Sequence, residues 1–99
     1  MNVKTIAVIG AGIAGRGIAY AALFGGYRTV LEDVSPERLE QAMTWIKQAF
    51  REGVLRGEYD ASFRDVAIQL ISAAHNVEDA IRGCRTQQEL CDTFADQDP

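Results

Sequence analysis

Apolar and polar positions along the chain predict strands and helices in alternation. Apolar and β-branched runs at residues 6–9, 27–33 and 70–74 suit short buried strands. Between them, residues 13–24 and 36–56 carry apolar side chains at helical spacing, which predicts two helices with one buried face each. Strands that alternate with helices in this way are typical of an α/β fold with a parallel sheet.

Local signals mark where these elements begin and end. Residues 25–26 are both glycine and end the first helix as C-cap glycines do. Ser35, followed by proline, is a hydroxyl N-cap for the second helix, which we expect to stop at Gly57. Asn76 is the candidate cap of a last short helix that we expect to stop at Gly83.

The first strand runs directly into a G-x-G-x-x-G sequence. Gly10 permits the tight turn from strand to helix, and Gly12 lets the backbone approach a pyrophosphate with no Cβ in the way. Gly15 allows the helix to pack close to the strand. The backbone N–H groups of Ile13 and Ala14 at the helix N-terminus would complete a phosphate-binding site.

Small residues continue along the first helix. Ala14, Gly17 and Ala21 recur at helical spacing, and we expect them to face the sheet closely. Glycine inside a helix costs about 1 kcal/mol relative to alanine, so close packing is the explanation that we favour for Gly17.

An acidic residue lies where ribose recognition requires one. Asp33 comes 21 residues after Gly12, at the end of the second strand, where a carboxylate accepts hydrogen bonds from the adenosine ribose. The same carboxylate would repel a 2′-phosphate, so NAD is favoured over NADP. Glu32 is expected to point away, because adjacent strand side chains face opposite sides. The alternative is that both acids only form a solvated strand end.

Two segments together resemble a known family. Residues 8–19 and 31–36 are similar to the start of the NAD-binding domain of the 3-hydroxyacyl-CoA dehydrogenases. The ribose-binding aspartate of that family falls on Asp33, whereas Ala14 stands where the family typically has methionine. The resemblance implies a Rossmann-type domain that binds NAD. It also implies hydride transfer to NAD from a 3-hydroxyacyl-CoA or a related hydroxy acid.

The resemblance ends after Gly83. The family continues there with an aliphatic strand, whereas residues 84–99 hold four acids, one base and no apolar run long enough for a central strand. We therefore expect residues 1–83 to form an incomplete NAD-binding domain, a three-layer βαβ unit with flanking helices and about three parallel strands. Residues 84–99 are expected to be a polar acidic tail, helical or disordered.

This ending bears on activity. The catalytic histidine and glutamate of the family lie beyond the length of this chain, so we expect a truncated chain with no catalytic residues and no activity alone. An FAD-binding flavoprotein fragment stays an alternative, since Gly-Ala-Gly-Ile-Ala-Gly also opens flavoproteins. Another alternative is a non-catalytic oligomerising remnant, because the first strand would have an unpaired edge. This predicts a homodimer through that edge or through exchange of a helix.

Charge, hydropathy and cysteine content bear on the partners and the location that we expect for the chain. A net charge of −4 over 99 residues, with no basic cluster, argues against nucleic acid. No segment is long and apolar enough to predict a membrane span. Cys84 and Cys91 fit neither a zinc site nor a C-x-x-C pair, so we expect no metal and two free thiols in a reducing cytoplasm.

Overall fold

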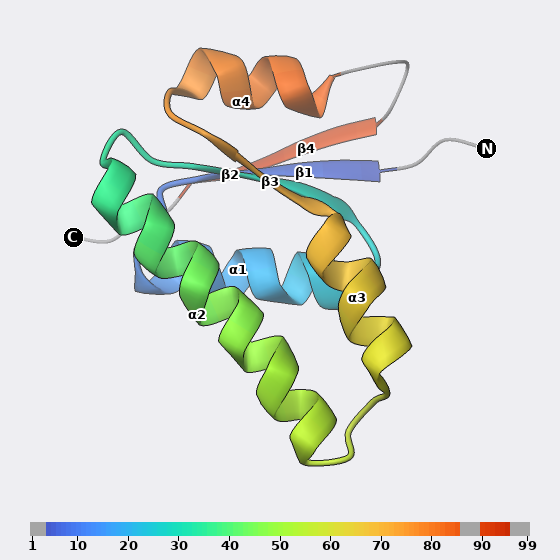
Figure 1. Cartoon of the computed structure of the whole chain (residues 1–99). Coiled ribbons are helices and arrows are strands. Elements are labelled where there is room, and N and C mark those ends of the chain that lie inside the picture. Colours follow the sequence, from blue (N-terminus) through green and yellow to red (C-terminus); the bar gives the residue numbers. More distant parts are fainter. Residues whose placement is uncertain (1–3, 86–89, 96–99) are drawn as a thin grey trace.

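Helices cover both faces of one sheet in the computed structural model, which describes residues 4–85 and 90–95 (Figure 1). In chain order the elements are β1 (Lys4–Ile9), α1 (Ile13–Phe24), β2 (Arg28–Glu32), α2 (Pro36–Leu55), α3 (Ala61–Gln69), β3 (Ile71–Ala74), α4 (Val77–Cys84) and β4 (Leu90–Ala95).

The strands lie in the order β3-β2-β1-β4, and all neighbours are parallel. This order matches the 3-2-1-4 arrangement within a doubly wound dinucleotide-binding sheet. Helix α4 covers one face, and α1, α2 and α3 lie on the other (Figure 1). The α/β class and the three layers predicted from the sequence are therefore confirmed.

The core is divided by the sheet. The larger part lies under α1, α2 and α3 and includes the fully buried Val8, Leu31, Ile46 and Phe50. A smaller cluster lies between the sheet and α4, where Val30, Ala74 and Ala80 pack against Ile9. Within the described residues, no helix is both long and apolar enough to span a membrane.

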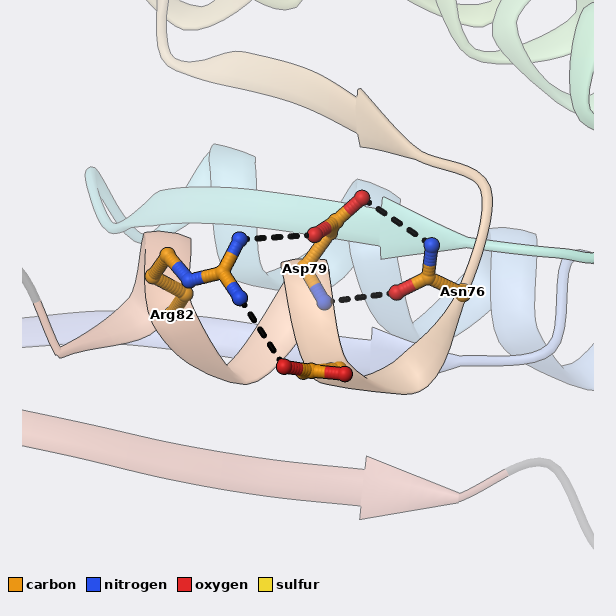
Figure 2. Close-up of polar contacts among 4 residues, drawn as sticks. Asn76, Asp79 and Arg82 are labelled. Carbon is orange, nitrogen blue, oxygen red and sulfur yellow. Dashed lines mark hydrogen bonds and ion pairs between the residues drawn. The ribbon is translucent and has the colours of Figure 1, made fainter.

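The predicted helix starts are confirmed. Helix α1 spans Ile13–Phe24, and the Ser35 hydroxyl caps α2 by accepting a hydrogen bond from the Arg38 N–H. At α4 the Asn76 side chain accepts from the Asp79 N–H at 2.8 Å and donates to its carboxylate at 3.0 Å (Figure 2). Arg82 bridges the carboxylates of Asp79 and Glu78 one turn later. Gly83 lies inside α4, which continues to Cys84, so the predicted stop at Gly83 is wrong.

The prediction of about three strands and of a tail without a strand is wrong for residues 90–95. These residues form β4, which pairs in parallel with the whole length of β1. A strand at the edge of the sheet needs no long apolar run, and β4 has an exposed Thr93 and Phe94. An ion pair between Lys4 and Asp92 also joins the two strands. Residues 86–89 and 96–99 of the predicted tail lie outside the described residues.

The prediction of free thiols is also wrong. Cys84 at the end of α4 and Cys91 in β4 form a disulfide, with their Cα atoms 5.4 Å apart. The spacing of seven residues gives no disulfide by itself; the end of α4 lies against β4, which brings the two sulfurs together. The cysteines therefore no longer support the cytoplasmic location inferred from free thiols.

Because β4 pairs with β1, the first strand has no open edge. The predicted homodimer was based on that unpaired edge, so the observation that motivated it is removed. In the described sheet the outer edges belong to β3 and β4.

The face of α1 that meets the sheet differs from the predicted one. Its buried residues are Gly15, Ala19, Ala22 and Leu23, whereas Ala14 and Ala21 are exposed. A Cβ added at Gly17 would have no neighbour within 4 Å. Close packing therefore explains Gly15 and does not explain Gly17.

Gly53 in α2, unlike Gly17, lies close to another side chain. A Cβ at this position would overlap the ring and hydroxyl of Tyr59. That ring is held by Phe63, with centroids 4.8 Å apart, and its hydroxyl lies 3.3 Å from the hydroxyl of Tyr20. Burial and the Tyr20 hydroxyl raise the pKa of Tyr59 to about 12. The space above Gly53 is thus occupied by a packed aromatic side chain.

The same substitution at these two helical glycines is expected to have opposite effects. Gly17→Ala raises the free energy of unfolding by about 1 kcal/mol, because it gains helix propensity at no steric cost. Gly53→Ala lowers it by about 1 kcal/mol or more, because the Tyr59 ring must move. Urea unfolding of both variants measures the two values. A loss of stability in Gly17→Ala would contradict the open space beside that glycine.

Removing the disulfide is expected to destabilise the fold. Cys91→Ser lowers the free energy of unfolding by about 2 kcal/mol, because the unfolded chain is no longer constrained between residues 84 and 91. Urea unfolding with and without dithiothreitol measures this effect. The reductant should lower the stability of the wild type to that of the variant and leave the variant unchanged. Insensitivity of the wild type to reduction would show that the two sulfurs are not bonded.

Candidate functional site

The turn from β1 to α1 is fixed by its backbone. Gly10 has a φ of 100°, a conformation that residues with a Cβ rarely adopt. Its N–H donates to the carbonyl of Glu32 at the end of β2, with a distance of 2.8 Å. The first glycine of the motif therefore makes the turn and ties it to the neighbouring strand.

The N-terminus of α1 is open. Gly12 is its N-cap and makes no side-chain cap hydrogen bond, and no acid lies in the first turn of the helix. The N–H groups of Ile13 and Ala14 lie in that first turn, where an α-helix provides no acceptor of its own. The Ile13 side chain is exposed, so this end of the helix faces solvent. Unsatisfied donors and the positive end of the helix dipole suit an anion here.

Asp33 lies beside this turn and is buried. Its Oδ2 accepts a hydrogen bond from the Ala11 N–H at 2.9 Å, and its Oδ1 accepts one from the Ser35 N–H at 2.9 Å. The Arg38 guanidinium lies 3.3 Å from Oδ2. One carboxylate thus contacts the glycine-rich turn, the residue that caps α2 and the first turn of α2.

These contacts set the ionisation of Asp33. Burial favours the neutral acid and raises the pKa of the carboxyl. The hydrogen bonds from the Ala11 and Ser35 N–H groups, together with the Arg38 guanidinium, outweigh burial and hold the pKa below its ordinary value of 3.8. Asp33 is therefore charged at neutral pH, and a carboxylate is the form that accepts two ribose hydroxyls.

The structure brings most of the predicted site residues together. Gly10, Gly12, Ile13 and Ala14 form the turn and the open helix end, and Asp33 is bonded to the residue between the two glycines. Gly15 is buried in α1, as expected of a packing position. Both Glu32 and Asp33 are only 3% exposed, so the alternative of a solvated strand end is wrong.

Three contacts of the site could not be predicted from the sequence. The Ala11 and Ser35 N–H groups and the Arg38 side chain all meet the Asp33 carboxylate. The Ser35 cap predicts where α2 begins. Arg38, five residues after Asp33, therefore falls in the first turn of that helix. The sequence pattern alone does not show that this side chain turns back toward Asp33.

A groove of about 740 Å³ runs between Arg16 of α1 and the outer face of α2, where the Arg16 guanidinium lies 4.9 Å from the centre of the Trp45 ring. Its lining residues are Arg16, Glu37, Glu40, Gln41, Thr44, Trp45 and Gln48. It contains none of the predicted phosphate-binding or ribose-binding residues.

Comparison with known proteins identifies the family. Residues 5–91 match the family described as "3-hydroxyacyl-CoA dehydrogenase, NAD binding domain". The chain belongs to this family. The matched range includes most of β1, the glycine-rich turn, Asp33 and the start of β4, and the family implies a nicotinamide dinucleotide as cofactor.

The names of individual relatives agree with this family assignment. A 3-hydroxybutyryl-CoA dehydrogenase from Bradyrhizobium diazoefficiens is 35% identical over 77 residues, which cover 78% of this chain and 26% of the relative. A 3-hydroxyadipyl-CoA dehydrogenase from Escherichia coli is 41% identical over 61 residues, which cover 62% of this chain and 13% of the relative. The chain thus spans about a quarter or less of the length of these two relatives.

Solved structures show the same fold. The crystal structure of a 3-hydroxybutyryl-CoA dehydrogenase from Escherichia coli K12 matches 80% of this chain and 17% of that chain, with a TM-score of 0.74 and 32% identity. An (S)-3-hydroxybutyryl-CoA dehydrogenase from Ralstonia eutropha matches 99% of this chain and 33% of that chain, with a TM-score of 0.80. At 17% identity, the second match shows likeness of fold alone.

The contacts of Asp33 predict a pH-dependent contribution to stability. Asp33→Asn is expected to lower the free energy of unfolding by about 2 kcal/mol at neutral pH, because it removes a charged acceptor from two N–H groups and a guanidinium. Since the folded pKa lies below 3.8, this contribution is complete above pH 3.8 and is lost as the pH falls through the folded value.

Urea unfolding of wild type and variant across the acidic range measures this difference. Asp65→Asn, at an exposed acid of α3, is the control and is expected to change stability at neutral pH by less than about 0.5 kcal/mol. An Asp33 effect that is constant from neutral pH to below the folded pKa would show that the charge of the carboxylate does not stabilise the fold.

Proposed function

We propose that this chain binds NAD through the Gly10–Gly15 turn and Asp33. The observation that carries the proposal is the hydrogen bond from the Ala11 N–H to the buried Asp33 carboxylate. It holds the acid that follows β2 beside the turn that leads to the open N-terminus of α1, at the carboxyl ends of two central parallel strands. Ligands of open α/β sheets bind at this end of the strands.

Each group has a separate part in binding. Gly12 keeps the space for the pyrophosphate free of a Cβ, and the N–H groups of Ile13 and Ala14 donate to phosphate oxygens. Gly15 acts through packing, since it sets α1 close to the sheet. The Asp33 carboxylate has acceptor capacity beyond its present partners and can take hydrogen bonds from the ribose hydroxyls. All of these groups serve the adenosine and pyrophosphate part of the cofactor.

The reaction class follows from the family. Relatives named for 3-hydroxybutyryl-CoA and 3-hydroxyadipyl-CoA support an oxidoreductase that acts on a 3-hydroxyacyl-CoA. NAD, when bound, accepts the hydride in such a reaction. We propose that this chain supplies the binding and orientation of the cofactor and performs no dehydrogenation alone. His75, the one histidine of the sequence, lies exposed directly after β3.

The alternatives differ in their support. The non-catalytic oligomerising remnant loses its motivating observation, because β4 covers the edge of β1. An FAD site uses a similar turn and is distinguished from an NAD site by direct titration.

Calorimetric titration of the purified chain with NAD⁺, and with FAD for comparison, tests the proposal. We expect NAD⁺ to bind, and Asp33→Ala to weaken it about tenfold or more, because the ribose loses a charged acceptor. Asp65→Ala removes an exposed carboxylate elsewhere and is the matched control. Circular dichroism confirms that each variant is folded. Absence of NAD⁺ binding by the folded wild type would contradict the proposal, and binding of FAD alone would establish the flavin alternative.

A further inference from the structure

The disulfide lies where three elements meet. Cys84 is the last residue of α4, and Cys91 belongs to β4. The Cys84 Sγ also lies 3.4 Å from the carbonyl oxygen of Thr5 in β1 and 3.7 Å from that of Asp92 in β4. The bond therefore ties β4 to α4 at a point where both elements contact the central strand β1 (Figure 1).

The side chains of β4 do little to hold this strand in place. Over residues 91–94, where the structure describes them, none is buried, and Thr93 and Phe94 are exposed. The ion pair between Lys4 and Asp92 is also open to solvent, with side chains 38% and 48% exposed. Such a pair adds little to stability. Over these residues, the attachment of β4 depends mainly on its backbone pairing with β1 and on the disulfide.

The two sulfurs differ in their access to solvent. The Cys84 side chain is fully buried, whereas that of Cys91 is half-buried in an edge strand. A thiolate opens a disulfide by attacking one of its sulfurs, and the rate depends on which sulfur the thiolate can reach. An external thiolate therefore has access to Cys91 and not to Cys84.

The contacts around the disulfide also suit the reduced protein. A Cys84 thiol would have two carbonyl oxygens within reach of its weak S–H donor, so α4 can keep its place on the sheet. The glycine-rich turn is held by two bonds to the β2 side, from the Gly10 N–H to the Glu32 carbonyl and from the Ala11 N–H to Asp33. Neither bond involves β4. Loss of the disulfide therefore removes the tether of β4 and leaves the contacts of the turn intact.

We propose that the Cys84–Cys91 pair is a thiol–disulfide exchange site that latches β4 onto β1. When a dithiol reduces it, β4 opens locally while the rest of the domain stays folded. The outer edge of β1 is then exposed, and such an edge is a template for pairing with another strand. This inference is independent of the proposed binding of NAD.

The exchange proceeds in two balanced steps. A thiolate of the dithiol attacks the Cys91 Sγ and forms a mixed disulfide there. The bond between the cysteines breaks, and the departing Cys84 thiolate takes up a proton. The second thiol of the reductant then loses its proton and attacks its own partner sulfur, which releases Cys91 as a thiol. Two electrons and two protons thus pass to the cysteines, and the dithiol becomes a disulfide.

Hydrogen exchange of the backbone amides, measured by mass spectrometry on the full chain with and without dithiothreitol, tests the latch. In the reduced chain we expect residues 90–95 to exchange at least tenfold faster than residues 28–32 of β2, because β4 opens without the rest of the fold. They should also exchange at least tenfold faster than in the oxidised chain. Exchange in β2 rises as well, because reduction lowers the stability of the whole fold, but it stays the slower of the two.

Two variants serve as controls. Cys91→Ser should show the fast exchange of residues 90–95 with and without dithiothreitol, because it has no disulfide to reduce. Asp92→Ala keeps the disulfide and removes only the ion pair with Lys4, so exchange in the oxidised variant should change less than about threefold. Circular dichroism confirms that each protein is folded.

The point of attack is tested by trapping the mixed disulfide. Brief reaction of the oxidised wild type with glutathione, a monothiol, is stopped with acid, and peptide mass spectrometry locates the adduct. We expect glutathione on Cys91, because this is the sulfur that solvent reaches.

Four outcomes would overturn the proposal. If residues 90–95 exchange equally fast in the oxidised and reduced chains, the disulfide does not hold β4. If the reduced chain exchanges residues 90–95 and 28–32 at one rate, β4 opens only when the whole domain unfolds, and there is no latch. Glutathione on Cys84 would reverse the direction of attack. A disulfide that neither thiol opens in the folded chain is not an exchange site.

Discussion

The hydrogen bonds of one buried carboxylate hold the candidate site together. Asp33 accepts from the Ala11 N–H, 22 residues earlier in the chain, and from the Ser35 N–H just after it. These bonds join the turn after β1 to the end of β2 and to the start of α2. A buried charge is costly unless it is paired, and here the donors that offset the cost are the backbone groups that shape the site. The acid is therefore fixed in place before any cofactor arrives.

This arrangement explains why the acid and the glycines belong to one unit. Gly10 can make its tight turn because glycine tolerates a positive φ, and the turn then presents the Ala11 N–H to Asp33. The Gly10 N–H bonds to the Glu32 carbonyl in the same region. The turn and the end of β2 thus fix each other's position. Together they set the direction of the open N-terminus of α1.

The features that could be predicted from the sequence are set by residues close together in the chain. The glycine spacing, the Ser35 and Asn76 caps and the helix over residues 13–24 depend on neighbours within a few positions, and the structure confirms them. The assignment of β4 failed because the rule that central parallel strands are apolar does not apply to an edge strand. The disulfide and the approach of Arg38 to Asp33 join residues only seven and five positions apart, yet both depend on how neighbouring elements pack, which the sequence pattern does not give. Gly17 shows that a glycine can stand in a helix without any packing that requires it.

The pairing of β1 with β4 also has a consequence for how the chain folds. Lys4 pairs with Leu90 and Ile9 with Ala95, so the central strand acquires its second neighbour from the opposite end of the described chain. Contacts between such distant segments must overcome a large loop-closure entropy before they stabilise anything, and they slow folding. The β1–β2–β3 half, whose pairings are closer in sequence, can form earlier. We therefore expect β4 to dock late in folding, and the disulfide between Cys84 and Cys91 to join it to α4.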